Sequence, residues 1–323
     1  RVQRRAAPPS DLSWLDVADG PNEEPADGAI VMPVFPLNVV EWPGNEVHLN
    51  IIEPAYRKMY DDILMSGTRR FLMPFSPCVP GFPRGRVRFP EMPPEDRRLH
   101  AVAPILYLED LREVSSQTDD VVKYQVKHSV VGRARMTRLL NPSALFRTNS
   151  DGWKVNYLRA EVEMLEETPD SALGSLDADD LSEAWEELRQ ISERTGEPQL
   201  QGEEQVRELA TTSKTWQLAD VWQQLQVALQ THREKVRVVT SVREWMESQP
   251  ELDVDNMALP DDMLESLQRV QSPHGLPLDN DFWEPLLRLQ AAGDAPARGE
   301  LLVAVARDEI RLARAREALR SMS

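Results

Sequence analysis

Apolar and polar side chains alternate along much of the first half of the chain. The segment VVKYQVKHSV, residues 121–130, places its apolar side chains and His128 on one side and its lysines on the other. The segment LRAEVEM, residues 158–164, repeats this period of two. Such a period is typical of a half-buried strand. Further strands are expected at residues 30–35, 46–52, 70–75, 101–108 and 133–139.

A helical pattern lies among these strands. Between Tyr56 and Met65 apolar side chains recur at spacings of three and four, and Gly67 follows as a stop signal. Residues 29–167 are therefore predicted to form a small, mostly antiparallel β domain with one early helix. Residues 1–28 are polar and contain several prolines and glycines, so we expect a flexible arm in which DLSWLDV docks as one helical turn.

A proline-rich segment, residues 76–98, interrupts the β pattern. It contains six prolines, and a proline has no backbone N–H to donate to a neighbouring strand. The segment is therefore expected to be a long loop inserted in the β domain. Long loops within compact domains tend to carry function.

After Thr168 the apolar period changes to 3.6 residues, which is typical of helices. One apolar face runs from residue 218 to residue 232, and shorter helices are expected at 178–193, 238–247, 260–269 and 281–290. Another apolar face joins Leu301, Val305, Leu312, Ala315 and Leu319. Residues 168–323 are therefore predicted to form a helical domain, and the chain is expected to belong to the α+β class.

The net charge is unevenly distributed along the chain. The formal charge is −17, and residues 167–323 hold 16 basic against 31 acidic residues, whereas residues 1–166 are close to neutral. The acidity is therefore a property of the predicted helical domain. Because an acidic surface repels phosphate backbones, binding to nucleic acid is not expected of the chain as a whole.

Other features of composition limit the compartment and the class of protein. Cys78 is the only cysteine, which excludes an internal disulfide and a multi-cysteine zinc site. The longest uncharged stretches, 29–40 and 72–83, contain prolines and fall short of the roughly 20 apolar residues that span a bilayer, so no transmembrane segment is expected. The basic start RVQRRAAPPS is similar to the remainder of an organelle transit sequence, with a plastid favoured over a mitochondrion. A terminus without targeting information is the alternative.

Residues 33–64, PVFPLNVVEWPGNEVHLNIIEPAYRKMYDDIL, combine two strand ends, a turn and a helix start. Pro36 ends the first strand, Pro43 and Gly44 reverse the chain, and Pro54 sets the first turn of the helix. This order of motifs resembles the start of the Lon protease N-terminal (LON substrate-binding) domain. The matching motifs are Phe35-Pro36-Leu37, Val39-Val40, Pro43-Gly44, Ile51-Ile52-Glu53-Pro54 and Tyr56-Arg57.

The resemblance covers roughly residues 30–166, because YLRAEVEMLEE is similar to the strand that closes that domain. It implies a PUA-like β pseudo-barrel that binds polypeptide. Glu41 and Trp42 depart from the apolar residues usual before Pro-Gly, and Ala55 stands where an Arg is common. Trp42 is therefore either an ordinary core residue or part of a contact surface.

The signatures of the enzymatic modules of a Lon protease are missing. A phosphate-binding loop contains Gly-Lys-Ser/Thr, and no lysine of this chain follows a glycine. No histidine precedes a glutamate, as the HExxH zinc motif requires, and no G-x-S-x-G motif occurs. We therefore expect a stand-alone domain protein that is not an enzyme, with no catalytic residue, no metal site and no cofactor.

The basic part of the proline-rich segment is the sharpest candidate for a contact surface. Its arginines, which include Arg97 and Arg98, alternate with phenylalanines, so it could dock an acidic partner or an RNA strand. Pairing with the acidic helical half of the same chain is the alternative. The candidate contact residues are Trp42, Phe82, Arg84, Arg86, Arg88 and Phe89.

Together these features predict a non-catalytic protein-binding module that acts as an adaptor, an assembly factor or a structural subunit of a larger organellar complex. Its partner would be a protein or an unfolded polypeptide, and self-association through the helices remains open. The alternative is an RNA-binding protein that uses a PUA-like barrel and the basic loop 84–98. An enzyme of unrecognised type is a third hypothesis, which would require a pocket with convergent polar groups.

Overall fold

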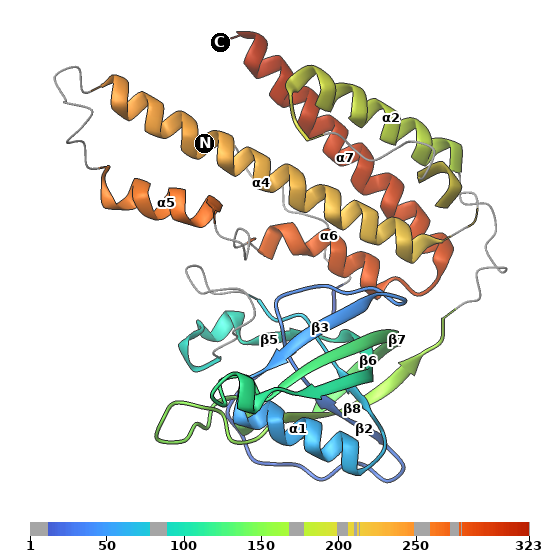
Figure 1. The fold of residues 1–323 in the computed structure, drawn as a ribbon. Helices are drawn as coiled ribbons and strands as arrows, with labels where there is room; N and C mark the ends of the chain where they lie inside the picture. Colours follow the sequence, from blue (N-terminus) through green and yellow to red (C-terminus); the bar gives the residue numbers. More distant parts are fainter. Residues whose placement is uncertain are drawn as a thin grey trace. The chain divides into compact units, whose positions relative to one another are not determined.

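The chain folds into two compact units (Figure 1). The computed structural model describes residues 12–77, 89–167, 178–198, 206–209, 212, 214–248, 259–271, 278 and 280–322. Unit 1 comprises Arg1–Pro169 and Asp279–Asp294, and unit 2 comprises Asp170–Leu278 and Ala295–Ser323. Unit 1 is rich in strands and unit 2 is helical, so the expected α+β class is confirmed. A segment near the end of the chain, 279–294, thus belongs to the β-rich unit.

Unit 1 is built on a closed sheet. Its described strands are β1 (Trp14–Asp16), β2 (Ile30–Val34), β3 (Glu46–Ile51), β4 (Arg70–Leu72), β5 (Arg98–His100), β6 (Val102–Glu113), β7 (Tyr124–Leu139) and β8 (Leu158–Leu165). Six of them follow the order β3-β7-β6-β4-β2-β8, and β8 also pairs with β7, which closes a barrel. Within these pairings only β2 and β4 run parallel. The predicted pseudo-barrel of mostly antiparallel strands is therefore present.

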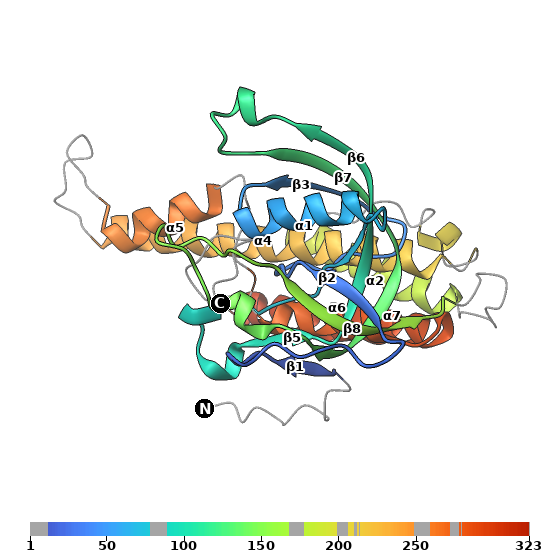
Figure 2. The same cartoon turned by 90° about the horizontal axis from the view of Figure 1, so that it is seen from below.

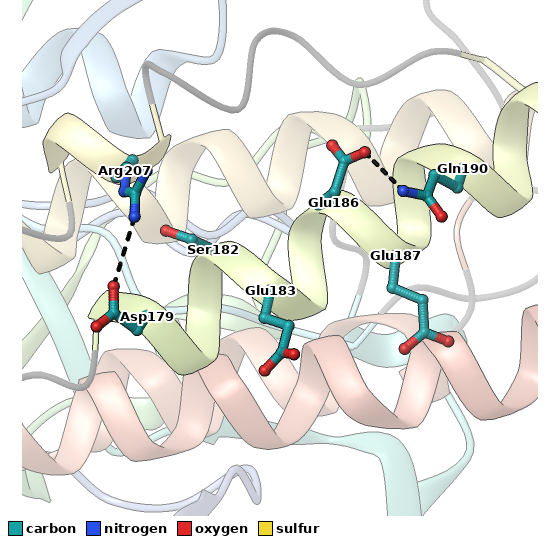
Figure 3. A pocket seen from close by; sticks show the side chains of 7 residues that line it. All are labelled: Asp179, Ser182, Glu183, Glu186, Glu187, Gln190 and Arg207. Atoms are coloured by element: carbon teal, nitrogen blue, oxygen red, sulfur yellow. Dashed lines mark hydrogen bonds and ion pairs between the residues drawn. The ribbon is translucent and has the colours of Figure 1, made fainter.

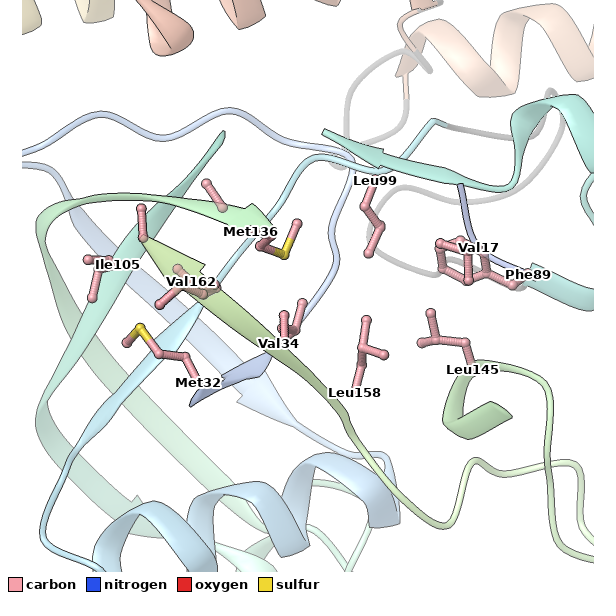
Figure 4. Close-up of a cluster of buried hydrophobic side chains, with 14 of the residues drawn as sticks. Val17, Met32, Val34, Phe89, Leu99, Ile105, Met136, Leu145, Leu158 and Val162 are labelled. Atoms are coloured by element: carbon pink, nitrogen blue, oxygen red, sulfur yellow. The ribbon is translucent and has the colours of Figure 1, made fainter. Parts of the chain in front are cut away.

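Two apolar cores lie in unit 1. The first fills the barrel with side chains from β2, β6 and β8, among them Val34, Ile105 and Leu158 (Figure 4). The second lies under the helix α1 (Pro54–Met65), which buries Tyr56, Met59, Tyr60 and Ile63. Full burial of one such side chain is worth roughly 1.5–3 kcal/mol relative to leaving it in water. The apolar residues that alternate along the strands, and those that recur at spacings of three and four along α1, are buried in these cores.

The Pro-Gly pair forms the predicted reversal. Asn45 N donates a hydrogen bond to Trp42 O at 3.0 Å, and Gly44 has a φ of 92°. Pro43 and Gly44 therefore occupy the two central positions of a type II turn, where the positive φ favours glycine. The turn leads into β3, which pairs with β7 along its whole length.

The motif residue Arg57 fastens the hairpin of β6 and β7 to the start of α1. Its Nη1 donates to both carboxylate oxygens of Asp120 at 2.8 and 2.9 Å, and its Nε donates to Ile52 O at 2.8 Å. Asp120 lies in the turn of that hairpin with a φ of 59°. The Tyr56-Arg57 pair thus serves the fold, since Tyr56 is buried in the core below α1.

The predicted helical turn at DLSWLDV is wrong, because Trp14–Asp16 forms β1. It pairs antiparallel with β5, and Val17 N donates to Arg97 O at 2.7 Å (Figure 2). The partner strand comes from the end of the proline-rich segment, where two 3₁₀ helices, Phe89–Glu91 and Pro94–Asp96, precede it. A strand paired over such a distance leaves no sign in local periodicity.

The described helices of unit 2 are α2 (Ala178–Thr195), α4 (Thr215–Glu247), α5 (Asp261–Gln271) and α7 (Ala295–Met322). The helices predicted around residues 218–232 and 238–247 are one continuous helix, α4. A ladder of ion pairs shows that α2 and α7 run parallel; it joins Asp180 to Arg307, Glu187 to Arg314 and Arg194 to Glu317. None of the helices in the described ranges is long and apolar enough to cross a bilayer.

Buried carboxylates join three segments of unit 2. Arg233 of α4 donates to Glu309 of α7 at 2.7 Å and to Glu197, which follows α2, at 3.3 Å. Arg316 donates to Glu309 at 2.7 Å as well. Because removal of one member would leave a buried charge uncompensated, this network fixes the register of α4 and α7.

The face predicted for α7 is not the one that packs inside unit 2. Leu312 and Leu319 are 56% and 68% exposed, whereas Leu302, Ala306 and Ala313 are buried. The helix is apolar on more than one side, so its periodicity does not select a face. The small side chains of Ala306 and Ala313 allow close approach to α2, and this contact decides the orientation.

Candidate functional site

Two of the six predicted contact residues belong to the part of the chain that the structure describes. Phe82, Arg84, Arg86 and Arg88 lie outside the described residues, as does Cys78. The side chains of Trp42 and Phe89 are fully buried, each with 0% exposure. Both therefore serve as core residues of unit 1, which corrects the expectation that they contact a partner.

An aromatic cluster lies in unit 1, and one of its residues, Phe75, directly precedes the proline-rich segment 76–98. We call Trp14, Phe75, Arg98, His100 and Trp283 the Trp14 cluster. The ring of Trp14 is 6.3 Å from Phe75 and 5.4 Å from His100, and Phe75 is 5.6 Å from Trp283. Strand β1, strand β5 and helix α6 (Asn280–Ala291) thus meet at these side chains.

Arg98 is the exposed cation of the cluster. Its guanidinium carbon lies 4.4 Å from the centre of the Trp14 ring, a distance at which a cation is attracted to the ring face. Its Nε is buried and has no hydrogen-bond acceptor in the described part of the chain. Asp16 lies opposite Arg98 in the register of β1 and β5, yet the two side chains form no ion pair.

The neighbouring Arg97 is used differently. Its Nε donates to Met92 O at 2.8 Å and its Nη2 to Pro90 O at 3.1 Å. These bonds hold the two 3₁₀ helices that precede β5. Of the two arginines at the end of the basic segment, Arg97 is therefore structural, whereas Arg98 forms no hydrogen bond or ion pair with the described residues.

His100 is a neutral, buried member of the cluster. Its Nδ1 lies 2.8 Å from Val102 O, so Nδ1 carries the proton and Nε2 keeps its lone pair. Burial lowers the pKa of His100 to about 4, and the charge of Arg135 lowers it further, against the opposing effects of Val102 O and Gln290. At neutral pH the positive charge near the cluster therefore comes from Arg98 and Arg135.

Helix α6 is held in place by a buried arginine. Arg133 of β7, 1% exposed, donates to the carbonyls of Gln290 and Ala292 and to Glu167 Oε1 at 2.6 Å. A cation at a helix C-terminus also interacts favourably with the helix dipole. In addition, the Gln290 side chain donates to Glu41 O at 3.1 Å. The position of Trp283 in the cluster depends on these contacts.

Sequence reasoning missed Trp14 and Trp283 as site residues. Trp14 was placed in a helical turn, and Trp283 lies in a helix expected to belong to the second half. Their contacts span most of the chain, so no local pattern reveals them. The one available signal was Arg98, which belongs to the basic segment singled out above.

Unit 2 carries an acidic pocket of about 470 Å³ on α2 (Figure 3). Its carboxylates are largely compensated, because Asp179 lies 3.6 Å from Arg207 and Glu186 lies 2.7 Å from Arg189. Glu187 pairs with an arginine of α7. Among the residues that the structure describes, no cluster of side chains is suited to hold a metal ion.

Comparison with known proteins finds Lon N-terminal domains among solved structures. A Lon N-terminal domain protein from Xanthomonas campestris is 18% identical and covers 62% of this chain and 89% of its own, with a TM-score of 0.31. The N-terminal domain of Lon protease from the Mycobacterium avium complex is 12% identical and covers 86% of this chain and 99% of its own, with a TM-score of 0.34. No family model and no curated protein matches the sequence.

Proposed function

We propose that this protein binds polypeptide without catalysing a reaction, and that the Trp14 cluster of unit 1 is the contact surface. One observation carries the proposal: an arginine that has no ionic partner among the described residues lies against a half-buried tryptophan at the surface of unit 1. Tryptophan and arginine are the residues most enriched where interfaces gain their binding energy.

The resemblance of residues 33–64 to the LON substrate-binding domain supports the same class of function. The motif residues themselves build the barrel and its hairpin, so binding is expected from side chains outside the motif. Lack of the nucleotide-binding and peptidase signatures in the sequence supports a non-catalytic role. Within this proposal the protein acts as an adaptor, an assembly factor or a subunit of a larger complex.

Fluorescence anisotropy with the full chain tests the proposal. The probe is a labelled unfolded polypeptide whose cysteines carry a neutral alkyl group, compared with the same protein in its native form. We expect the unfolded form to bind and the native form to bind at least roughly tenfold more weakly, a difference of about 1.4 kcal/mol. Equal binding of both forms would contradict recognition of unfolded polypeptide.

Substitutions locate the surface. Trp14→Ala and Arg98→Ala are expected to weaken binding, whereas Arg112→Ala removes an exposed arginine elsewhere in unit 1 and is expected to leave it unchanged. Circular dichroism confirms that each variant is folded. A labelled single-stranded RNA serves as a competing probe, and tight binding of it with a steep salt dependence would replace this proposal by the RNA-binding alternative.

A further inference from the structure

We infer that the Trp14 cluster selects a polypeptide segment that carries a carboxylate beside an apolar side chain, and that Arg98 binds the carboxylate. The inference rests on the proposed function and names the chemistry of its ligand. It concerns one side chain whose partner is missing from the described part of the chain.

The guanidinium of Arg98 offers donors that no described residue of unit 1 uses. Among the described residues it contacts the Trp14 ring and forms no hydrogen bond or ion pair. Its Nε is buried, so the terminal nitrogens are the accessible donors of this half-exposed side chain. Two parallel N–H groups fit the two oxygens of a carboxylate, and such charge-assisted pairs are about twice as strong as neutral hydrogen bonds.

The stack on Trp14 holds this donor pair ready for a ligand. A free arginine loses rotamer entropy when it becomes ordered. The contact with the ring restricts the side chain before a ligand arrives, which lowers that loss on binding. Trp14 itself is fixed by pairing with His100 across β1 and β5 and by its contact with Phe75. The site is therefore largely preformed.

Two arginines lie near His100 of the cluster. Arg135 is close enough to His100 to lower its pKa and, like Arg98, forms no ion pair in the described part of the chain. His100 is neutral at pH 7 because its pKa is lowered to about 4, so it neither adds a charge nor competes for one. Asp16 is the acidic residue nearest in the strand register, and it is exposed and unpaired with Arg98. In the strand register Asp16 lies opposite Arg98 and Glu163 lies opposite Arg135, and neither pair forms an ion pair among the described residues.

The overall acidity of the chain does not prevent this selection. Residues 1–166 are close to neutral, and the charge of −17 lies mainly in the second half of the sequence. At physiological ionic strength charges are screened over about 8 Å, so the charged groups beside the site determine whether it binds a carboxylate. The apolar part of the selection comes from the half-buried faces of Trp14 and of Phe282, whose ring is 5.0 Å from Trp283.

A pair of peptides tests the inference on the full chain. One is a labelled peptide of glutamate, leucine and serine, and its twin has glutamine in place of every glutamate. We expect the acidic peptide to bind roughly tenfold tighter than its twin, as one charge-assisted contact allows. Arg98→Ala is expected to abolish this preference while the twin binds as before. Arg112→Ala, the matched control, keeps the preference, and Arg98→Lys keeps only part of it.

The possible results distinguish failure of the proposed function from failure of this further inference. Equal binding of both peptides by the unsubstituted protein overturns the inference and leaves polypeptide binding intact. A preference that survives Arg98→Ala overturns the assignment to Arg98. If neither peptide binds, the proposed function fails together with the inference. Loss of the preference in Arg98→Ala but not in Arg112→Ala supports the inference, because a merely structural role of Arg98 would weaken the binding of both peptides equally.

Discussion

Replacement of Arg133 by methionine should loosen α6 from the barrel of unit 1. The guanidinium donates to two carbonyls, of Gln290 and Ala292, and pairs with Glu167, while the side chain is 1% exposed. Methionine keeps most of the apolar stem, so the change removes mainly the polar contacts. Two carbonyls and one carboxylate then lose their buried donor.

The expected cost is about 3–5 kcal/mol, the range found when one partner is removed from a buried ion pair. Unfolding by urea, followed by circular dichroism, measures this free energy. Arg112→Met is the control, because Arg112 is exposed and a surface substitution usually changes stability by less than about 0.5 kcal/mol. We also expect hydrogen exchange of the α6 amides to become faster in Arg133→Met.

A loss below about 1 kcal/mol for Arg133→Met would refute this reasoning, since two carbonyls and one carboxylate each lose a charge-assisted hydrogen bond from a buried donor. If the variant fails to fold, Glu167→Gln gives a milder measurement. Glu167 is 28% exposed at its side chain, so its neutral analogue should cost about 1 kcal/mol and still quicken exchange in α6.

Three further predictions concern pH, α7 and the motif arginine. Burial lowers the pKa of both His100 and His128 to about 4, so below pH 6.5 the unfolded chain binds more protons than the folded chain. Urea unfolding should therefore show the free energy of unfolding falling between about pH 6.5 and 4, by roughly 3 kcal/mol for each histidine. The fall should be shallower in His128→Gln; an equal slope would contradict the assignment. Ala313→Leu should lower the thermal midpoint through overpacking worth about 1–3 kcal/mol, whereas Leu319→Ser should leave it unchanged. A larger loss for Leu319→Ser than for Ala313→Leu would mean that α7 packs through the face predicted from the sequence. Arg57→Ala should cost about 1–3 kcal/mol by urea unfolding and quicken hydrogen exchange at the tip of the β6–β7 hairpin, and unchanged exchange there would mean that the ion pair with the hairpin is dispensable.

Much of unit 1 was predictable because its strands each bury one face. The alternation in residues 158–164 matches β8, and the spacing of apolar residues matches α1. The strands predicted at 121–130 and 133–139 are one continuous strand, β7. The lengths of β6 and β7 were not predictable. Residues 109–113 of β6 are exposed or half-buried, so their side chains show no alternation between core and water that would extend the predicted strand.

The site was less accessible to sequence reasoning, because it depends on where distant segments meet. Nothing local in Trp14–Asp16 shows that its partner is β5. Nothing in α6 shows that it packs on the β-rich unit, although Pro285 and the neighbouring Phe282 and Trp283 made it unusual. By contrast, composition alone indicates the basic segment, and among its described arginines Arg97 bonds to backbone carbonyls whereas Arg98 has neither a hydrogen bond nor an ion pair within the described residues.

The late position of α6 in the sequence has a consequence for synthesis on the ribosome. Arg133 and its acceptor at Gln290 are separated by 157 residues. At about 5–20 residues per second, translation needs roughly 8–30 seconds to bridge that separation. During this interval the barrel has been synthesised but α6 has not. Arg133, which is buried in the folded protein, and the ring of Phe75 therefore lack the helix that covers them. The newborn chain is thus most vulnerable to aggregation, and most in need of a chaperone, after its barrel has emerged.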